Sequence, residues 1–322
     1  MRRYPSWVYP VLGLALACLA ILAWLAPVQR SRTSHGNGSP TPEKSVPLEL
    51  VTPHLSNADA RINEAVHNHF LPVRALLNRG RSNTDKFAKL ALGWSSKWRI
   101  ATDAIPFTKG GSNEKYLKEQ FELHVLNGEE LQRAIEQCVN EFIAEVHSIE
   151  SKMLVDLQAD VQGFSREHQL AKLDSKEIQS MFDQAISNAM QVASSDLQSN
   201  ISSQLVSIVV GEVLTQVAIR LGVSAGILGT GAASSWATLG IGLVVGIVID
   251  QIVMTIWNSW SDPEGKLVDS LNQQLDLMQR IICDGDQDTK GLAQHFAEIA
   301  NSRSSLRRKA VLEIYGIDGL SN

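Results

Sequence analysis

The chain has 322 residues, of which 44% are hydrophobic and 20% are charged, a composition typical of a folded protein with one large or two modest domains. The formal net charge of -5 argues against general nucleic-acid binding, which needs a basic surface. Three cysteines fit neither a disulfide-rich scaffold nor a zinc site, although Cys138 and Cys283 could pair if the soluble region is extracytoplasmic.

The first predicted element is an N-terminal transmembrane anchor over residues 1–28. Residues 7–28 contain no charged side chain, and about 22 positions give roughly 33 Å of helix, enough to cross a bilayer. A cleaved signal peptide would have a shorter apolar core, and a lipoprotein signal at Cys18 would turn polar soon after it. We therefore expect a retained signal-anchor, with the amino terminus inside by the positive-inside rule.

Residues 29–52 are rich in Ser, Pro, Gly and Thr and are predicted to be a flexible linker. A helical domain over residues 53–204 follows. Its first helix is expected to begin at Ser56, which has capping-box spacing to Asp59, to be kinked or interrupted at Pro72, and to end at Arg79-Gly80-Arg81.

A long helix is predicted from about Asn113, because apolar residues recur there every 11 positions, a spacing typical of three helical turns. One row is Leu131, Phe142, Met153 and Phe164, and the second is Ile135, Val146 and Leu157. A second amphipathic helix opens at Asp174-Ser175, with Ile178 and Phe182 on its apolar side. Together they predict a long antiparallel helical hairpin, although the same rows could form a coiled-coil interface between copies of the chain.

Charge is distributed unevenly over this domain. Residues 53–118 contain 11 Lys/Arg and 5 Asp/Glu, whereas residues 119–200 contain 5 Lys/Arg and 15 Asp/Glu. The favoured interpretation is that two helical layers pack through complementary surfaces, and the alternative is a basic platform for anionic lipid.

Residues 205–258 are predicted to be a second apolar, glycine-rich helical hairpin. Between Leu205 and Trp257 the only charges are Glu212, Arg220 and Asp250, and each arm of about 20 residues could span a bilayer. The turn would lie near residues 229–235, which places Glu212 level with Asp250 at the open end. Arg220 would face a partner, a polar lumen or lipid headgroups.

Small residues favour close packing of the two arms. Gly222 and Gly226 share one face of the first arm, and Gly242 and Gly246 share one face of the second, as in a glycine zipper. A transmembrane hairpin is favoured over a single span near residues 236–257, and over a hairpin buried inside the soluble bundle. Long helices flanking such a hairpin resemble the architecture of α-helical pore-forming toxins, which implies membrane insertion.

The C-terminal segment, residues 259–322, is predicted to contain two helices. Asp262-Pro263 opens the first, which has a stripe of Leu267, Leu271, Leu275 and Met278. The last helix has four basic residues, which are expected either on a solvated face or against lipid headgroups: Arg303, Arg307, Arg308 and Lys309.

Three motifs suggest chemistry, and none is assigned a role. Ser224 lies in a G-x-S-x-G match, with Asp250 and His295 following in hydrolase order, but no strands surround it, so glycine packing is favoured. Asp284–Asp288 resembles the start of a calcium loop, yet Thr289 replaces its glycine, which favours an acidic turn. His67 and His69 lack a cluster with zinc spacing. No cofactor, metal or small-molecule substrate is predicted.

The sequence therefore predicts an all-α, non-enzymatic, membrane-anchored scaffold or interaction protein. Its partners would be a lipid bilayer and, through helical faces, other copies of the chain. The expected location is a bacterial-type inner membrane, with the helical domain extracytoplasmic. A membrane-inserting or pore-forming protein is the first alternative, and a serine hydrolase using Ser224 is the second.

Overall fold

The computed structural model describes residues 46–93, 112–168, 175–191, 201–220 and 262–317, which are helices and short connections without a strand. The predicted all-α class is therefore confirmed for these residues. In chain order the helices are α2 (Leu48–Ala65), α3 (Leu71–Ser82), α4 (Thr84–Leu92), α6 (Ser112–His124), α7 (Gly128–His168), α8 (Ser175–Gln191), α9 (Ile201–Arg220), α12 (Pro263–Cys283) and α13 (Leu292–Ile314).

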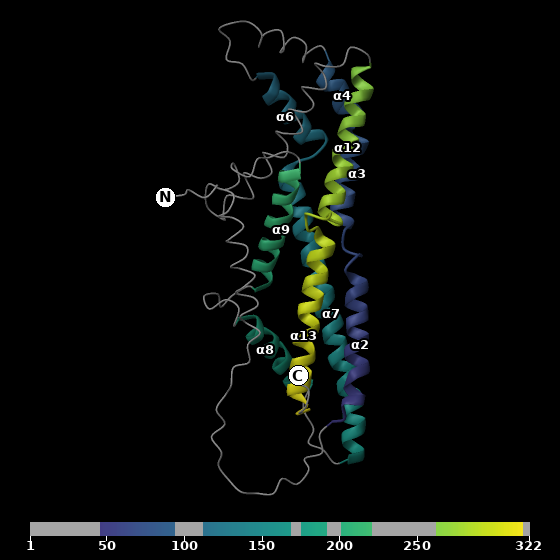
Figure 1. Cartoon of the computed structure of the whole chain (residues 1–322), viewed down its shortest axis with the longest axis vertical. Coiled ribbons are helices and arrows are strands. Elements are labelled where there is room, and N and C mark those ends of the chain that lie inside the picture. Colours follow the sequence, from purple (N-terminus) through teal and green to yellow (C-terminus); the bar gives the residue numbers. More distant parts are fainter. Residues whose placement is uncertain (1–45, 94–111, 169–174, 192–200, 221–261, 318–322) are drawn as a thin grey trace, which may run out of the picture.

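Helix α7 is the central element of an elongated bundle (Figure 1). Its 41 residues extend over roughly 60 Å. Helices α2 and α3 pack along one side of it, and α9, α8 and α13 also contact it. Residues 131, 142 and 153 of the first predicted row are buried, as are Ile135, Val146 and Leu157 of the second, so the 11-residue spacing correctly indicates the inward face.

The direction of packing follows from pairs of contacting residues. His54 pairs with Asp160 of α7, His69 with Glu141, and Arg79 with Glu130. The residue numbers thus rise along α2 and α3 while those of the partners on α7 fall. Helices α2 and α3 are therefore antiparallel to α7. Helix α8, the expected partner of α7 in a long hairpin, packs chiefly on α13 instead.

These pairs also connect the basic segment of the sequence with the acidic one. His54, His69 and Arg79 belong to the basic segment, whereas Asp160, Glu141 and Glu130 belong to the acidic one. Of the three, only the pair of Arg79 with Glu130 joins fixed opposite charges, since a histidine is cationic only when protonated. The interpretation that two layers pack through complementary surfaces therefore stays a prediction. Each pair is partly exposed, and such pairs typically contribute up to about 1 kcal/mol, so they set the register of the helices more than their stability.

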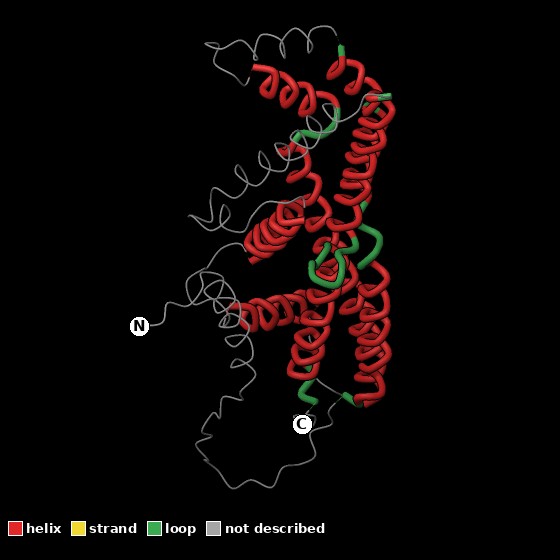
Figure 2. The backbone as a smooth tube through the Cα atoms, turned by 45° about the horizontal axis from the view of Figure 1, so that its top comes forward, coloured by secondary structure: helices red, strands yellow, loops and turns green. Residues whose placement is uncertain are grey.

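Helices α12 and α13 follow one another along the long axis of the bundle, as Figures 1 and 2 show. Helix α12 packs on α3 and α4, where Arg81 Nη2 lies 2.6 Å from Asp276 Oδ1 and donates to Gln279 Oε1 at 2.9 Å. The predicted start of α12 is confirmed, because the Asp262 side chain accepts a hydrogen bond from the Gly265 backbone N–H and Pro263 opens the helix.

The first helix begins and ends elsewhere than predicted. It starts at Leu48 and not at Ser56, so residues 48–52 of the predicted linker are helical. The buried positions Val51, Leu55 and Ala58 continue the helical spacing through Pro53, whose missing N–H interrupts only one backbone bond. The break expected near Pro72 is confirmed, since α2 ends at Ala65 and α3 begins at Leu71.

Gly80 does not end α3, contrary to the prediction. The helix continues to Ser82, and Gly80 lies on its buried face with Val73 and Leu77. A Cβ atom at Gly80 would lie 2.7 Å from the backbone oxygen of Val125, so the glycine allows the connection between α6 and α7 to approach α3 closely. The prediction that Gly80 terminates the helix was wrong. The glycine is needed at this position for close packing against the Val125 backbone.

Helix α9 is the only described part of the predicted second hairpin. Its valine-rich face is buried against the bundle, where it contacts α7, α12 and α13: Val206, Val209, Val210, Val213, Leu214, Val217 and Ala218. Among the helices of the described ranges, none combines the length and the hydropathy needed to cross a bilayer. The anchor at residues 1–28, the packing glycines 222, 226, 242 and 246, and Asp250 lie outside the described residues.

Candidate functional site

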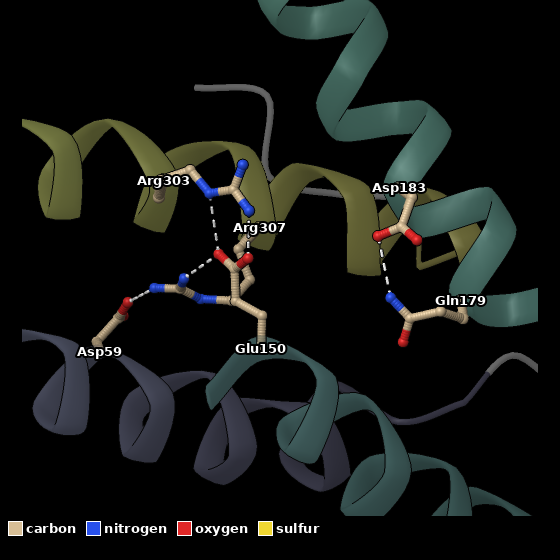
Figure 3. Close-up of polar contacts among 6 residues, drawn as sticks. All are labelled: Asp59, Glu150, Gln179, Asp183, Arg303 and Arg307. Atoms are coloured by element: carbon tan, nitrogen blue, oxygen red, sulfur yellow. Dashed lines mark hydrogen bonds and ion pairs between the residues drawn. The ribbon is translucent and has the colours of Figure 1, made fainter. Parts of the chain in front are cut away.

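A cluster of charged side chains, most of them buried, joins three helices of the bundle (Figure 3). Asp59 comes from α2, Glu150 from α7, and Arg303 and Arg307 from α13. We call these four residues the Glu150 cluster. Each member lies among apolar residues that its own helix buries, such as Ala58, Ile149 and Ala300, so regular helical spacing brings the charges inward.

The Glu150 carboxylate is the hub of this cluster. Its Oε1 accepts from Arg303 Nε at 3.2 Å and from Arg307 Nη1 at 2.8 Å, and its Oε2 accepts from Arg303 Nη2. Arg307 Nη2 donates in turn to Asp59 Oδ1. Figure 3 shows the chain of contacts, together with Gln179 and Asp183, which pair with each other along α8.

Burial makes the charges of this cluster interdependent. Arg307 is 1% exposed and Glu150 is 2% exposed, whereas the side chain of Asp59 is 37% exposed. Two guanidinium groups and two carboxylates have no net charge, and each ion is hydrogen-bonded to an opposite one. Removing one partner would leave an uncompensated buried charge, which typically costs about 3–5 kcal/mol. The cluster thus fixes the register of α2, α7 and α13.

The expectation for the basic residues of the last helix was wrong in two of four cases. Arg303 and Arg307 are buried and bind Glu150, while Arg308 and Lys309 are exposed. The physical reason is position along the helix. Phe296, Ala300, Arg303, Arg307 and Val311 follow the three-to-four residue spacing of the buried face, and that face continues through the two arginines.

A second group of polar contacts lies where α9 meets the connection between α12 and α13. Arg220, at the end of α9, donates from Nη2 to Asp286 Oδ1 at 2.8 Å and to Asp288 Oδ2 at 3.0 Å. Two turns earlier, Glu212 Oε2 lies 3.9 Å from Nε2 of the buried His295. We call these contacts the α9 docking contacts. Both described residues of the predicted intramembrane polar set, Glu212 and Arg220, therefore face partners in the bundle.

Two groups that take part in the α9 docking contacts have shifted pKa values. Burial lowers the pKa of His295, and this effect exceeds the opposing influence of the nearby Glu212 and Glu298 carboxylates. The pKa of Asp286 is lowered to about 2 by the Thr289 hydroxyl and the Asp288 backbone N–H, with a further contribution from Arg220. Near neutral pH, His295 is therefore neutral and Asp286 is ionised.

The segment that resembles a calcium loop is an acidic turn, as favoured from the sequence. Asp286 Oδ1 accepts from the backbone N–H groups of Asp288 and Thr289, both at 2.9 Å, and from the Thr289 hydroxyl at 2.8 Å. The carboxylate therefore closes its own turn and pairs with Arg220. Within the part of the chain that the structure describes, no three His, Cys, Asp or Glu side chains are placed to hold a metal ion.

The remaining motifs lie apart from these two groups. His67 is exposed, with its ring edge toward Phe70 at 6.5 Å between centroids, and His69 lies against Phe142 and near Glu141. Of the hydrolase set, His295 is buried in α13, whereas Ser224 and Asp250 lie outside the described residues. Comparison of the chain with protein-family models, curated proteins and solved structures finds no match.

Proposed function

We propose that the chain is a non-enzymatic scaffold that residues 1–28 anchor in a membrane and whose helical bundle holds the apolar segment 205–258 in place. The observation that supports this proposal is the docking of α9, the first part of that segment, on α7, α12 and α13. The proposed location is the outer face of a bacterial-type inner membrane. Lipid and other copies of the chain are the proposed partners.

Two kinds of contact hold α9 on the bundle. Its inward face consists of valines with one leucine and one alanine, and full burial of each valine or leucine side chain contributes about 1.5–3 kcal/mol. Arg220 adds a directional contact, because its guanidinium can reach Asp286 and Asp288 only when the end of α9 lies beside their turn. Apolar packing thus supplies affinity, and the ion pairs supply register.

The rest of the bundle is suited to act as a fixed support. Helix α7 extends along the molecule, and the Glu150 cluster fastens it to α2 and α13. A support of this kind works by placement: it sets where the apolar segment lies relative to the anchor, and no bond of a substrate has to be made or broken.

The full chain reconstituted in dye-filled vesicles tests this function. We expect the protein to stay with the vesicles through an alkaline carbonate wash without releasing dye. Leu14→Arg combined with Ile21→Arg should abolish carbonate-resistant binding, because each charge at the centre of a membrane helix costs about 2.5–3.5 kcal/mol. Dye release at low protein-to-lipid ratios would contradict the scaffold role.

A membrane-inserting function is the second candidate, and the outer surface of α9 favours it. Ile208 is 62% exposed and Ile219 is 42% exposed, so α9 has apolar side chains on its outer as well as its inner side. If α9 leaves the bundle to insert, Arg220→Gln should increase dye release because it removes the ion pairs that hold the end of the helix. Equal, negligible release by both proteins would exclude this mechanism.

A further inference from the structure

Two buried cysteines from distant parts of the sequence lie beside the same turn of α3. Cys138 of α7 is 0% exposed and Cys283, the last residue of α12, is 1% exposed, and both thiols are free. Besides burial, the Val73 backbone influences the pKa of Cys138 and the side chain of the next residue, Arg74, influences the pKa of Cys283, while the Cys283 thiol itself influences the pKa of Cys138. Both sulfur atoms therefore lie near one turn of one helix.

The register of the helices also places Cys138 and Cys283 near the same level of α3. Along α3 and α7, the contacts of His69 with Phe142 and of Arg79 with Glu130 flank the level of Val73 and Cys138. Along the antiparallel helix α12, the contact of Arg81 with Gln279 is followed one turn later by Cys283. Arg74 lies seven residues, about two turns, before Arg81 on α3. The levels of Arg74 and Cys283 therefore agree to within about one turn.

We propose that Cys138 and Cys283 are a redox-active pair that forms a reversible disulfide between α7 and α12. The oxidant is a low-molecular-weight or protein disulfide. One cysteine attacks it and releases one thiol, and the second cysteine then attacks the mixed disulfide and releases another. The chain loses two electrons and two protons, and the oxidant gains both as two thiols. The pairing requires neither the membrane anchor nor the scaffold role.

The surroundings of the two sulfur atoms determine the expected rate. Burial raises the pKa of Cys138 to about 12 and the pKa of Cys283 to about 11, although the Val73 backbone and Arg74 favour the thiolate forms. Few chains have a thiolate at neutral pH, and a disulfide reagent reaches it only when the helices open locally. Oxidation should therefore be slow, and faster at higher pH.

The bond would join parts of the chain that are far apart in sequence. A loop of about 145 residues between the cysteines is the kind for which a disulfide most restricts the unfolded chain. It would tie α12 to α7 directly, whereas α12 now meets the bundle chiefly through α3, α4 and α9. Oxidation should therefore raise the thermal midpoint of the full chain by at least about 2 °C.

The experiment treats the reduced full chain with oxidised glutathione under native conditions, then blocks free thiols in denaturant and maps cysteine peptides by mass spectrometry. We expect a linked pair of peptides containing Cys138 and Cys283, while Cys18 remains alkylated, and we expect dithiothreitol to reverse the link. Full alkylation of both cysteines would overturn the proposal. Separate glutathione adducts on Cys138 and Cys283, or pairing of either with Cys18, would also overturn it.

Single variants provide the matched control. In Cys138→Ala and in Cys283→Ala, the same oxidant should leave the thermal midpoint unchanged within about 1 °C, because no bond can form between α7 and α12. A similar increase in the midpoint in either variant would show that the stabilisation has another origin. The peptide map of the unaltered chain does not depend on how well these variants fold.

Discussion

The four charged side chains of the Glu150 cluster lie where helical spacing would ordinarily place apolar residues. Glu150 and Arg307 are almost completely removed from water, and desolvating two ions costs several kcal/mol each unless hydrogen bonds and opposite charges compensate. Here one carboxylate receives three hydrogen bonds from two guanidinium groups. Such a cluster adds little net stability as a whole, but the loss of any one member is costly.

Glu150→Gln is therefore expected to destabilise the full chain by about 3–5 kcal/mol, because it removes the carboxylate that two buried guanidinium groups share. Thermal unfolding in mild detergent, followed by circular dichroism, measures this effect. Asp156→Asn on the exposed side of α7 is the control, since its pair with Lys152 is exposed and contributes at most about 0.5 kcal/mol. Equal midpoints for the two variants would contradict the role of the cluster.

The sequence spacing indicated that two members of this cluster face inward, but their charge led to the opposite prediction. Arg303 and Arg307 continue the spacing of Phe296, Ala300 and Val311, which predicts an inward position. Arginine is usually exposed, so the same residues were expected on a solvated face. The partners Asp59 and Glu150 could not be predicted, because they belong to helices that only the tertiary fold brings together.

At the scale of the helices, close approach and not intrinsic helix propensity decides where small residues are needed. Gly80 and Gly163 both lie within helices, and an alanine would normally improve each position. A Cβ atom at Gly80 would lie too close to the backbone oxygen of Val125, whereas nothing lies within 4 Å of that position at Gly163. Replacing each glycine by alanine is therefore expected to change the stability of the chain in opposite directions.

Gly80→Ala should destabilise the chain by about 1–3 kcal/mol, because the new methyl group collides with a backbone oxygen that has little room to move. Gly163→Ala should stabilise it by about 0.5–1 kcal/mol through lower backbone entropy in the unfolded chain. Denaturant titrations of the two variants against the unaltered chain test the pair. Stabilisation by Gly80→Ala would mean that α3 can move away from Val125 at low cost.

Helix α9 should respond to acid through His295. The pKa of this buried imidazole is lower in the folded chain than in the unfolded one, so the folded state binds fewer protons. Its contribution to stability is fully present above the unfolded pKa of about 6.5 and is lost as the pH falls from there through the folded value. The charged groups that influence it are Glu212 on α9, Glu298 on α13 and Lys290 before α13.

Hydrogen–deuterium exchange of α9 at pH 7.5 and pH 5.5, corrected for intrinsic rates, measures this response. We expect faster corrected exchange at pH 5.5, because protonation of His295 weakens the surface on which α9 docks. His295→Gln, which cannot titrate in this range, should remove the pH dependence. An unchanged pH dependence in that variant would assign the effect to other groups.

At the scale of the whole molecule, hydrophobic periodicity predicted most of the helices but few of their neighbours. The rows on α7, the break at Pro72 and the start of α12 are local patterns, and each was found as predicted. The pairing of α7 chiefly with α2 and α3, and of α8 with α13, depends on contacts across the chain that periodicity does not encode. Complementary charge was the one global signal in the sequence, and across this interface it is represented by the pair of Arg79 with Glu130.

The measurement that tests the scaffold account most directly is disulfide cross-linking between α9 and α13 in membranes. Glu212→Cys and His295→Cys, whose native side chains approach to 3.9 Å, are introduced into the full chain without its native cysteines. Ser207→Cys with His295→Cys is the control, because position 207 points about 140° away from position 212 on α9. The account predicts that the first pair cross-links as readily in membranes as in detergent, and the control pair in neither. A cross-link that forms in detergent and is lost in membranes would contradict the account and show that α9 leaves the bundle.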